Sequence, residues 1–296
     1  MLNLIRMNLY RMVKTKSLWV VMFCMGMFCV FSCSMSKMDL TEGKKEADMV
    51  NDMNGNAASE PLMGIYQGEE DEEVDAVFGI AVNVPEKENG EVPAFLEFYN
   101  ADLASGIVLI FLTIGCALYF NGEIKSGFLK NIAGQTRHKS SIFLSKIFVN
   151  MIYVLLALFV YGIVQYISLK FLFADQFTFR FGKEYLKETG LLVLSIYLLH
   201  LAFSGGISLI TVMFKSTAVS ITVGMLSAFG LINSFVPYIE KSLDVKLLKY
   251  MVTTNIHQML IGTAEKDVMF AISVGILYSV FYYLLGTAYF TKKDVV

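Results

Sequence analysis

Long apolar runs, separated by short charged segments, dominate the pattern of this 296-residue chain. An α-helix of roughly 20 apolar residues crosses a bilayer core about 30 Å thick, and six runs approach or exceed that length. The segments of a transmembrane β-barrel would be about half as long and would alternate with polar residues. We therefore predict an all-α polytopic membrane protein. Its transmembrane helices are expected at residues 18–35, 103–120, 147–173, 191–214, 217–239 and 268–290.

The basic segment before the first run, residues 1–17, predicts an interfacial helix on the inner leaflet. Its apolar residues share one helical face and are Leu2, Ile5, Leu9, Met12 and Val13. Two alternatives are a basic flank that only orients the first span and a signal peptide, since residues 30–33 are similar to a lipoprotein cleavage site. We expect the first helix to be retained, because its leader is long and amphipathic and because cleavage would leave five spans.

Two longer connections are expected on the outer side. Residues 36–102 predict a small extracellular cap, in which residues 74–84 alternate like a half-buried strand and residues 94–104 form a short amphipathic helix that leads into the second span. The acidic run 69–73 is more typical of a solvated loop than of a site for cationic substrates or calcium, since its acids are contiguous. Residues 240–267 predict an extracellular or partly re-entrant helical segment.

The distribution of basic residues predicts the orientation of the chain. Hydrophobic residues make up 55% of the sequence and charged ones only 17%. Lys and Arg are densest in the N-terminal segment and in residues 121–146, whereas most Asp and Glu lie in the outer connections. The positive-inside rule then predicts a multi-pass protein of the cell membrane with both termini in the cytoplasm, including the tail 291–296. Trp19, Tyr119 and Tyr289 all fall at the predicted inner interface.

No motif for catalysis, for a bound cofactor or for nucleic acid is visible. Residues 134–140 end like a phosphate-binding loop, but His138 and Ala133 occupy the places of its two required glycines. The three histidines lie far apart in sequence, and the four cysteines fall inside apolar runs, where free Cys behaves as a small hydrophobe. We expect neither an enzyme nor a metal site. Because the phosphate-binding loop is incomplete, any ATP-driven role would need a separate ATPase chain.

Polar residues within the apolar runs give a candidate substrate path, formed by Gln165, His200 and Asn233. His200 is the ionisable residue nearest the middle of a predicted span, and we expect a neutral ring that is hydrogen-bonded to a neighbouring helix. A proton relay through His200 would require a carboxylate partner within a span. The small-residue stripe Ser220, Gly224 and Ala228 predicts close helix packing, with a dimer seam or flexible gate as the alternative.

Residues 121–146 predict a short amphipathic cytoplasmic helix followed by a basic stretch. One helical face carries Ile124, Phe128, Leu129 and Ile132, and the basic side chains of Lys125 and Lys130 point elsewhere. The apolar pair Phe128 and Leu129 suits a groove on a soluble partner.

The same segment carries Glu123, Gly127, the run Lys130, Asn131 and Ile132, the pair Thr136-Arg137, and Ser145-Lys146 before the third span. In these residues it resembles the permeases of the type-2 ABC exporter family, above all the bacitracin-export and lantibiotic-immunity permeases. The resemblance extends to the order of spans, although members usually carry Ser-Arg where this chain has Thr136-Arg137.

The resemblance implies a helix that docks into an ABC ATP-binding subunit, where ATP and Mg²⁺ would be bound. The residues expected to couple to that subunit are Glu123, Lys125, Gly127, Phe128, Leu129, Lys130, Asn131, Ile132 and Arg137. It also implies a second permease chain, identical or paralogous, and an amphipathic antimicrobial peptide or lipophilic antibiotic as cargo that leaves the bilayer or the cell.

Two other classes of function remain open from the residues alone. A membrane sensor or scaffold would bind a peptide through the 36–102 cap without transport. A proton-coupled carrier would depend on His200 and would transport without ATP.

Overall fold

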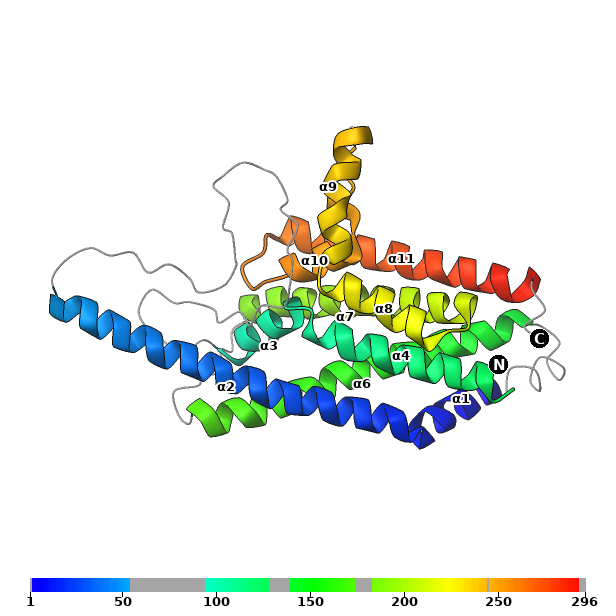
Figure 1. Ribbon diagram of the computed structural model, residues 1–296, viewed down its shortest axis with the longest axis horizontal. Coiled ribbons are helices and arrows are strands. Elements are labelled where there is room, and N and C mark those ends of the chain that lie inside the picture. Colours follow the sequence, from blue (N-terminus) through cyan, green and yellow to red (C-terminus); the bar gives the residue numbers. More distant parts are fainter. Residues whose placement is uncertain (1, 54–93, 128–138, 174–182, 244, 293–296) are drawn as a thin grey trace.

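The computed structural model describes residues 2–53, 94–127, 139–173, 183–243 and 245–292, and this part of the chain is helical and contains no strand. Figure 1 shows the helices as one elongated bundle. Their bounds are α1 (Leu2–Lys14), α2 (Lys16–Met53), α3 (Phe95–Ala104), α4 (Ile107–Lys125), α6 (Lys139–Phe173), α7 (Lys183–Phe214), α8 (Thr217–Ala228), α9 (Leu231–Leu243), the 3₁₀ turn η2 (Leu248–Tyr250), α10 (Val252–Gln258) and α11 (Glu265–Lys292).

Within the described residues, five helices are long and apolar enough to cross a membrane, which confirms an all-helical architecture with several candidate spans. They cover Lys16–Met38, Ile107–Lys125, Ser140–Phe173, Thr189–Phe214 and Glu265–Tyr289. The first helix departs from the expected bounds, because α2 runs on to Met53, well beyond the predicted end at residue 35. The strand expected at 74–84 and most of the proposed cap lie outside the described residues.

The fifth predicted span, 217–239, is two helices in the structure rather than one. α8 and α9 meet at an angle of 70°, and α9 projects away from the bundle in Figure 1. Gly230 lies between them with a φ of 72°, a left-handed conformation that favours glycine. The chain therefore bends at Gly230 and not at Pro237, which lies inside α9.

The core of the bundle is formed around α4 and α7. In the apolar windows of these two helices 67% of the residues are buried, against 22% in α11, so that α11 presents most of its surface outward. α7 packs against α11, α4, α8 and α6. The large exposed apolar residues of α2, α6 and α11 are what lipid-facing surfaces require.

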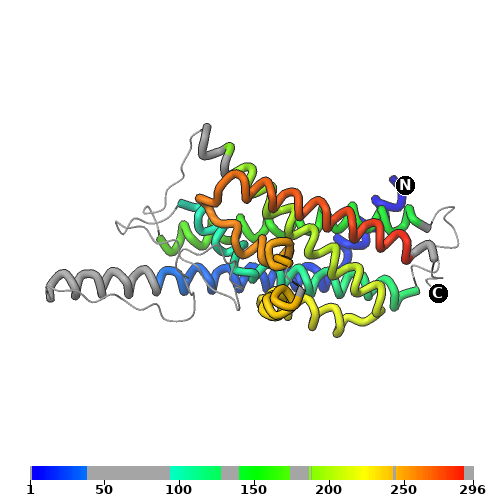
Figure 2. The backbone as a smooth tube through the Cα atoms, turned by 90° about the horizontal axis from the view of Figure 1, so that it is seen from above, coloured from blue at the N-terminus to red at the C-terminus, as the bar shows by residue number. Residues whose placement is uncertain are grey.

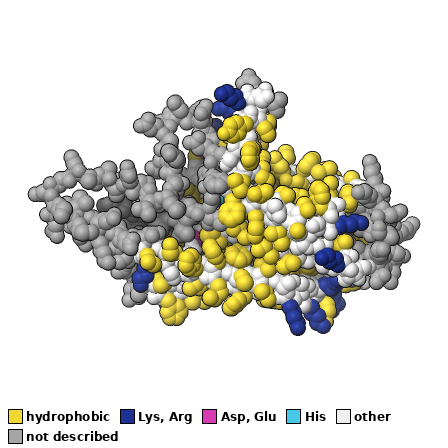
Figure 3. Space-filling model, viewed as in Figure 1, with side chains coloured by type: hydrophobic (Ala, Val, Ile, Leu, Met, Phe, Trp, Pro, Cys, Tyr) yellow, Lys and Arg dark blue, Asp and Glu magenta, His cyan; other side chains and the backbone are white. Residues whose placement is uncertain are grey.

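The first and last described helices begin and end at the same end of the bundle, as Figures 1 and 2 both show. In the face shown in Figure 3, hydrophobic side chains cover the middle of the bundle and Lys and Arg gather toward that end. Exposed basic residues on the helices and connections at that end include Arg6, Lys14, Lys125 and Lys215. The same end therefore combines the start of α1 and the end of α11 with a basic surface.

Candidate functional site

A buried ion pair lies where α4 approaches the start of α6. Lys146 of α6 pairs with Glu123 of α4, and their side chains are 0% and 2% exposed. The Lys146 ammonium also lies 5.3 Å from the centroid of the Phe120 ring, within the range of a cation–π attraction. Because a buried charge is stable only with its partner, this pair fixes the rotation of α6 against α4.

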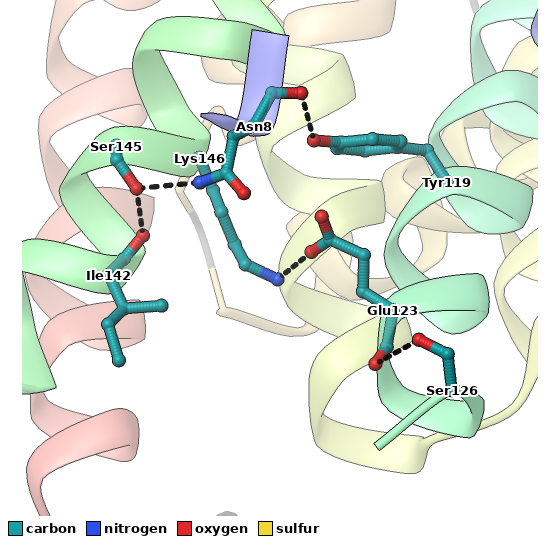
Figure 4. A network of polar contacts seen from close by, with 7 residues as sticks. All are labelled: Asn8, Tyr119, Glu123, Ser126, Ile142, Ser145 and Lys146. Carbon is teal, nitrogen blue, oxygen red and sulfur yellow. Dashed lines mark hydrogen bonds and ion pairs between the residues drawn. The ribbon is translucent and has the colours of Figure 1, made fainter. Parts of the chain in front are cut away.

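The N-terminal helix α1 packs onto the same place, as Figure 4 shows. The Asn8 side-chain amide donates to Ser145 Oγ at 2.8 Å, and the Tyr119 hydroxyl donates to the Asn8 carbonyl at 3.2 Å. Ser145 in turn donates to the Ile142 carbonyl at 2.7 Å. One residue of α1 thus contacts both α4 and α6 next to the ion pair. We call Asn8, Tyr119, Glu123, Ser145 and Lys146 the basal network.

The residues predicted to couple to an ATPase chain fall into three groups. Glu123 is buried in the ion pair, so its carboxylate does not face a partner in this conformation. Lys125 is exposed at the end of α4, and Gly127 follows with a φ of 66°. The other six, Phe128, Leu129, Lys130, Asn131, Ile132 and Arg137, lie outside the described residues.

The three residues of the predicted substrate path are not brought together. Gln165 donates to Asp102 Oδ2 at 2.7 Å, and Asn233 accepts from the Thr253 hydroxyl at 2.8 Å. His200 is 0% exposed, and its Nδ1 lies 2.8 Å from the Ile196 carbonyl one turn earlier in the same helix. The expected bond from His200 to a neighbouring helix is therefore replaced by one within α7.

The sequence reasoning missed a second buried polar cluster, centred on Asp102 of α3. Its Oδ1 accepts from Ser32 of α2 at 3.1 Å, and its Oδ2 accepts from Tyr161 of α6 at 3.0 Å. Together with the bond from Gln165, also of α6, these contacts tie two helices, α2 and α6, to one carboxylate of α3. Burial raises the pKa of Asp102 to about 6, and the hydrogen bonds from Tyr161 and Ser32 oppose that shift.

Two cysteines lie beside this carboxylate. The Sγ atoms of Cys29 and Cys33 and one Asp102 oxygen are within 4.8 Å of one another, and all three residues are buried. We call Asp102, Ser32, Tyr161, Gln165, Cys29 and Cys33 the Asp102 cluster. Its signal in the sequence is the spacing of Cys29, Ser32, Cys33 and Ser36, which places small polar side chains along one face of an apolar helix. That spacing does not indicate which other helix supplies the carboxylate.

A third set of polar side chains connects the middle of the bundle. Cys116 of α4 donates to Asn150 Oδ1 of α6 at 3.4 Å, and Asn150 donates to Ser204 Oγ of α7 at 2.9 Å. In a membrane interior such bonds between helices satisfy groups that lipid cannot. They hold α4, α6 and α7 in register between the basal network and the Asp102 cluster.

His257 of α10 lies near the beginning of α4. Its Nδ1 is 2.6 Å from the Ala104 carbonyl, and burial lowers the pKa of the ring while that hydrogen bond opposes the shift. Gly106, with a φ of 82°, approaches the same ring, since a Cβ there would meet His257 Cε1 at 3.0 Å and the Ala228 carbonyl oxygen at 2.8 Å. This crossing brings the end of α8, the start of α4 and α10 together.

A surface cavity of about 470 Å³ lies between the start of α7 and the beginning of α11. Its lining includes Thr189, Leu192 and Val268, with Lys187 and Glu265 at 3.7 Å from one another on its exposed side. It is separate from both buried networks.

A comparison with protein families gave a match. A family model described as a protein of unknown function (DUF2705) matches residues 65–296. No curated protein matches the chain.

Proposed function

The chain belongs to the DUF2705 family of proteins of unknown function, and we propose that it is the membrane-spanning permease subunit of an ATP-driven ABC exporter. A second permease chain and two ATP-binding subunits would complete the transporter. ATP and Mg²⁺ would be bound by those subunits. The cargo would be an amphipathic antimicrobial peptide or a lipophilic antibiotic, which moves out of the cell or out of the bilayer.

The observation that carries this proposal is the basal network. It ties together the two helices that flank residues 128–138, the segment expected to dock on the ATPase. Because Glu123 and Lys146 are buried and paired, a force on that segment would move α4 and α6 as one body. Asn8 would extend the movement to α1.

The positions of the two ends of the described chain also support an ATPase bound at the end of the bundle that holds the basal network. The basal network, the start of α1 and the end of α11 lie at one end of the bundle, where exposed Lys and Arg gather (Figures 1 and 3). A basic end is the one retained in the cytoplasm under the positive-inside rule. The bent pair of α8 and α9 offers an element that can change its angle between inward-open and outward-open states.

Affinity purification of the tagged, full-length chain from its native membrane tests the proposal. The expected result is a co-purifying soluble ATPase that is lost in Phe128→Asp. A matched control is Val245→Asp, which places the same charge at an exposed apolar residue, 49% exposed, in the connection after α9. This control should retain the ATPase.

The absence of any ATPase under conditions that retain other membrane complexes would contradict the permease assignment. An ATPase that both variants keep equally would instead remove residues 128–138 from the contact.

A further inference from the structure

The Asp102 cluster contains two thiols and one carboxylate close enough to share an ion. Cys29 and Cys33 are four residues apart on α2, so their side chains leave the same face of the helix one turn apart. Asp102 reaches them from α3, and the three possible ligand atoms lie within 4.8 Å of one another. The three residues are 0%, 2% and 4% exposed. Solvent therefore does not separate them.

The carboxylate is also oriented as a metal ligand would be. Ser32, Tyr161 and Gln165 donate hydrogen bonds to it at 3.1, 3.0 and 2.7 Å. Metal-binding carboxylates are held in this way by outer partners that fix their rotation. The two helices α2 and α6 contribute these partners, so the position of Asp102 is determined by packing on both sides.

Two features of the cluster are unexplained by the protein alone. Among the described residues, Lys146 is the one Lys or Arg whose side chain is buried. It is already paired with Glu123 at the other end of the bundle. Asp102 thus has no buried cationic side chain beside it in the described part of the chain. The Gln165 side chain is 0% exposed, and its Oε1 has no hydrogen-bond partner among those residues although its Nε2 bonds Asp102.

A cation would answer both deficits, because it would lie directly against the carboxylate and accept a lone pair from an amide oxygen. We propose that Cys29, Cys33 and Asp102 bind one Zn²⁺ ion, with Gln165 Oε1 as the candidate fourth ligand. The two thiols would bind as thiolates and release two protons, so that the site carries the same net charge with the ion as without it. The ion would join α2, α3 and α6 as a structural staple.

The donor set selects the metal. Zn²⁺ accepts sulfur and oxygen ligands together in a tetrahedral arrangement. Ca²⁺ takes six to eight oxygen ligands, and Mg²⁺ prefers six, which this cluster does not offer. Tetrahedral Zn²⁺ with bonds of about 2.0–2.3 Å places ligand atoms roughly 3.5 Å apart. Rotation of the Cys side chains about χ1 can bring the Sγ atoms to this distance from one another and from the carboxylate oxygen.

Titration of the purified, metal-free, full-length chain with Co²⁺ tests the site. We expect tetrahedral Co²⁺ bands and a thiolate-to-cobalt charge-transfer band, both removed by one equivalent of Zn²⁺. Cys29→Ser and Cys33→Ser should abolish the charge-transfer band at matched metal concentration. Tyr161→Phe should weaken Zn²⁺ binding about 10–100-fold by releasing the carboxylate.

Two cysteines of the same chain provide matched controls. Cys24 is exposed on α2, and Cys116 is buried on α4 beside Asn150. Cys24→Ser and Cys116→Ser should leave the titration unchanged. Absence of the charge-transfer band in the unmodified chain overturns the proposal, as does its persistence in the double variant Cys29→Ser/Cys33→Ser.

A measurement without substitutions covers the case in which a variant fails to fold. The unmodified chain is alkylated with iodoacetamide during gentle heating, with and without Zn²⁺, and each cysteine is followed by mass spectrometry. Zn²⁺ should protect Cys29 and Cys33 and leave the rate at Cys24 unchanged. Equal rates at Cys29 and Cys33 in both conditions overturn the site. None of these readouts depends on an ATPase partner, so the zinc site and the permease assignment can fail separately.

Discussion

Two buried side chains of opposite charge, Glu123 near the end of α4 and Lys146 of α6, neutralise one another. Because both side chains are buried, loss of one partner should lower the stability of the fold strongly, whereas loss of both should lower it little. The reason is that a single remaining charge keeps its desolvation cost without its compensating attraction.

Lys146→Met should therefore lower the free energy of unfolding by about 3–5 kcal/mol, because Glu123 is left buried and unpaired. Thermal or denaturant unfolding in detergent measures the change. The double variant Glu123→Leu/Lys146→Met should recover most of the loss. Lys125→Met, at an exposed lysine two residues from Glu123, is the control and should stay within about 0.5 kcal/mol. A double variant less stable than Lys146→Met would contradict the account.

His257 makes stability depend on pH. Burial holds the pKa of its ring below the ordinary value of 6.5, so the unfolded chain binds a proton at a higher pH than the folded chain does. The stability contributed by neutral His257 is complete above pH 6.5 and is lost as the pH falls below that value. His257→Gln should flatten this part of the pH profile, measured as the midpoint of thermal unfolding from pH 7.5 to 5. An unchanged profile in the variant would place the titration elsewhere.

At the scale of elements, the small residues of α8 face α4 of the same chain. Ser220 and Ala228 are 0% exposed, and a Cβ on Gly224 would lie 2.3 Å from Thr113 Cγ2. The stripe predicted from the sequence is thus a packing surface within the bundle, and the alternative of a dimer seam is wrong for these residues. Only glycine at position 224 allows the two helices to approach so closely.

Gly224→Ala should consequently cost about 1–3 kcal/mol, since the added methyl group collides with Thr113. Thr113→Ala in the same chain removes both atoms that collide and should restore part of the stability. Gly122→Ala is the matched control, because a Cβ there meets nothing within 4 Å. The same unfolding measurement compares all three variants, and equal losses at positions 122 and 224 would refute the packing argument.

At the scale of the whole molecule, both ends of the described chain lie at the basic end of the bundle, with the basal network. The permease proposal requires that end to face the cytoplasm. Labelling of single introduced cysteines by a membrane-impermeant maleimide tests the orientation in a Cys24→Ser background. The exposed residue Lys266, at the start of α11, and Lys125, at the end of α4, are suitable positions.

Lys266→Cys should be labelled in intact cells, whereas Lys125→Cys should be labelled only after the membrane is permeabilised. The reverse pattern would invert the chain and would remove residues 128–138 from any cytoplasmic ATPase. Labelling at both positions in intact cells would argue against burial of the bundle in the bilayer.

The lengths and spacing of apolar residues were sufficient to predict the helical class, five long helices and the short helix that leads into α4. Such signals are local, since a run of apolar residues or a face of a helix is visible in consecutive positions. The resemblance to ABC permeases and the expected cargo also came from the sequence, and both stay predictions.

Tertiary structure alone decided which polar groups meet. Asp102, Gln165 and Cys29 belong to three helices, and their convergence depends on how each helix is rotated and crossed. The same holds for Glu123, which the sequence placed at a partner surface and the fold placed opposite Lys146. A polar residue in an apolar run must find a hydrogen-bond partner, and the sequence shows this. It does not show which residue is the partner, because the packing of the whole bundle decides which side chains meet.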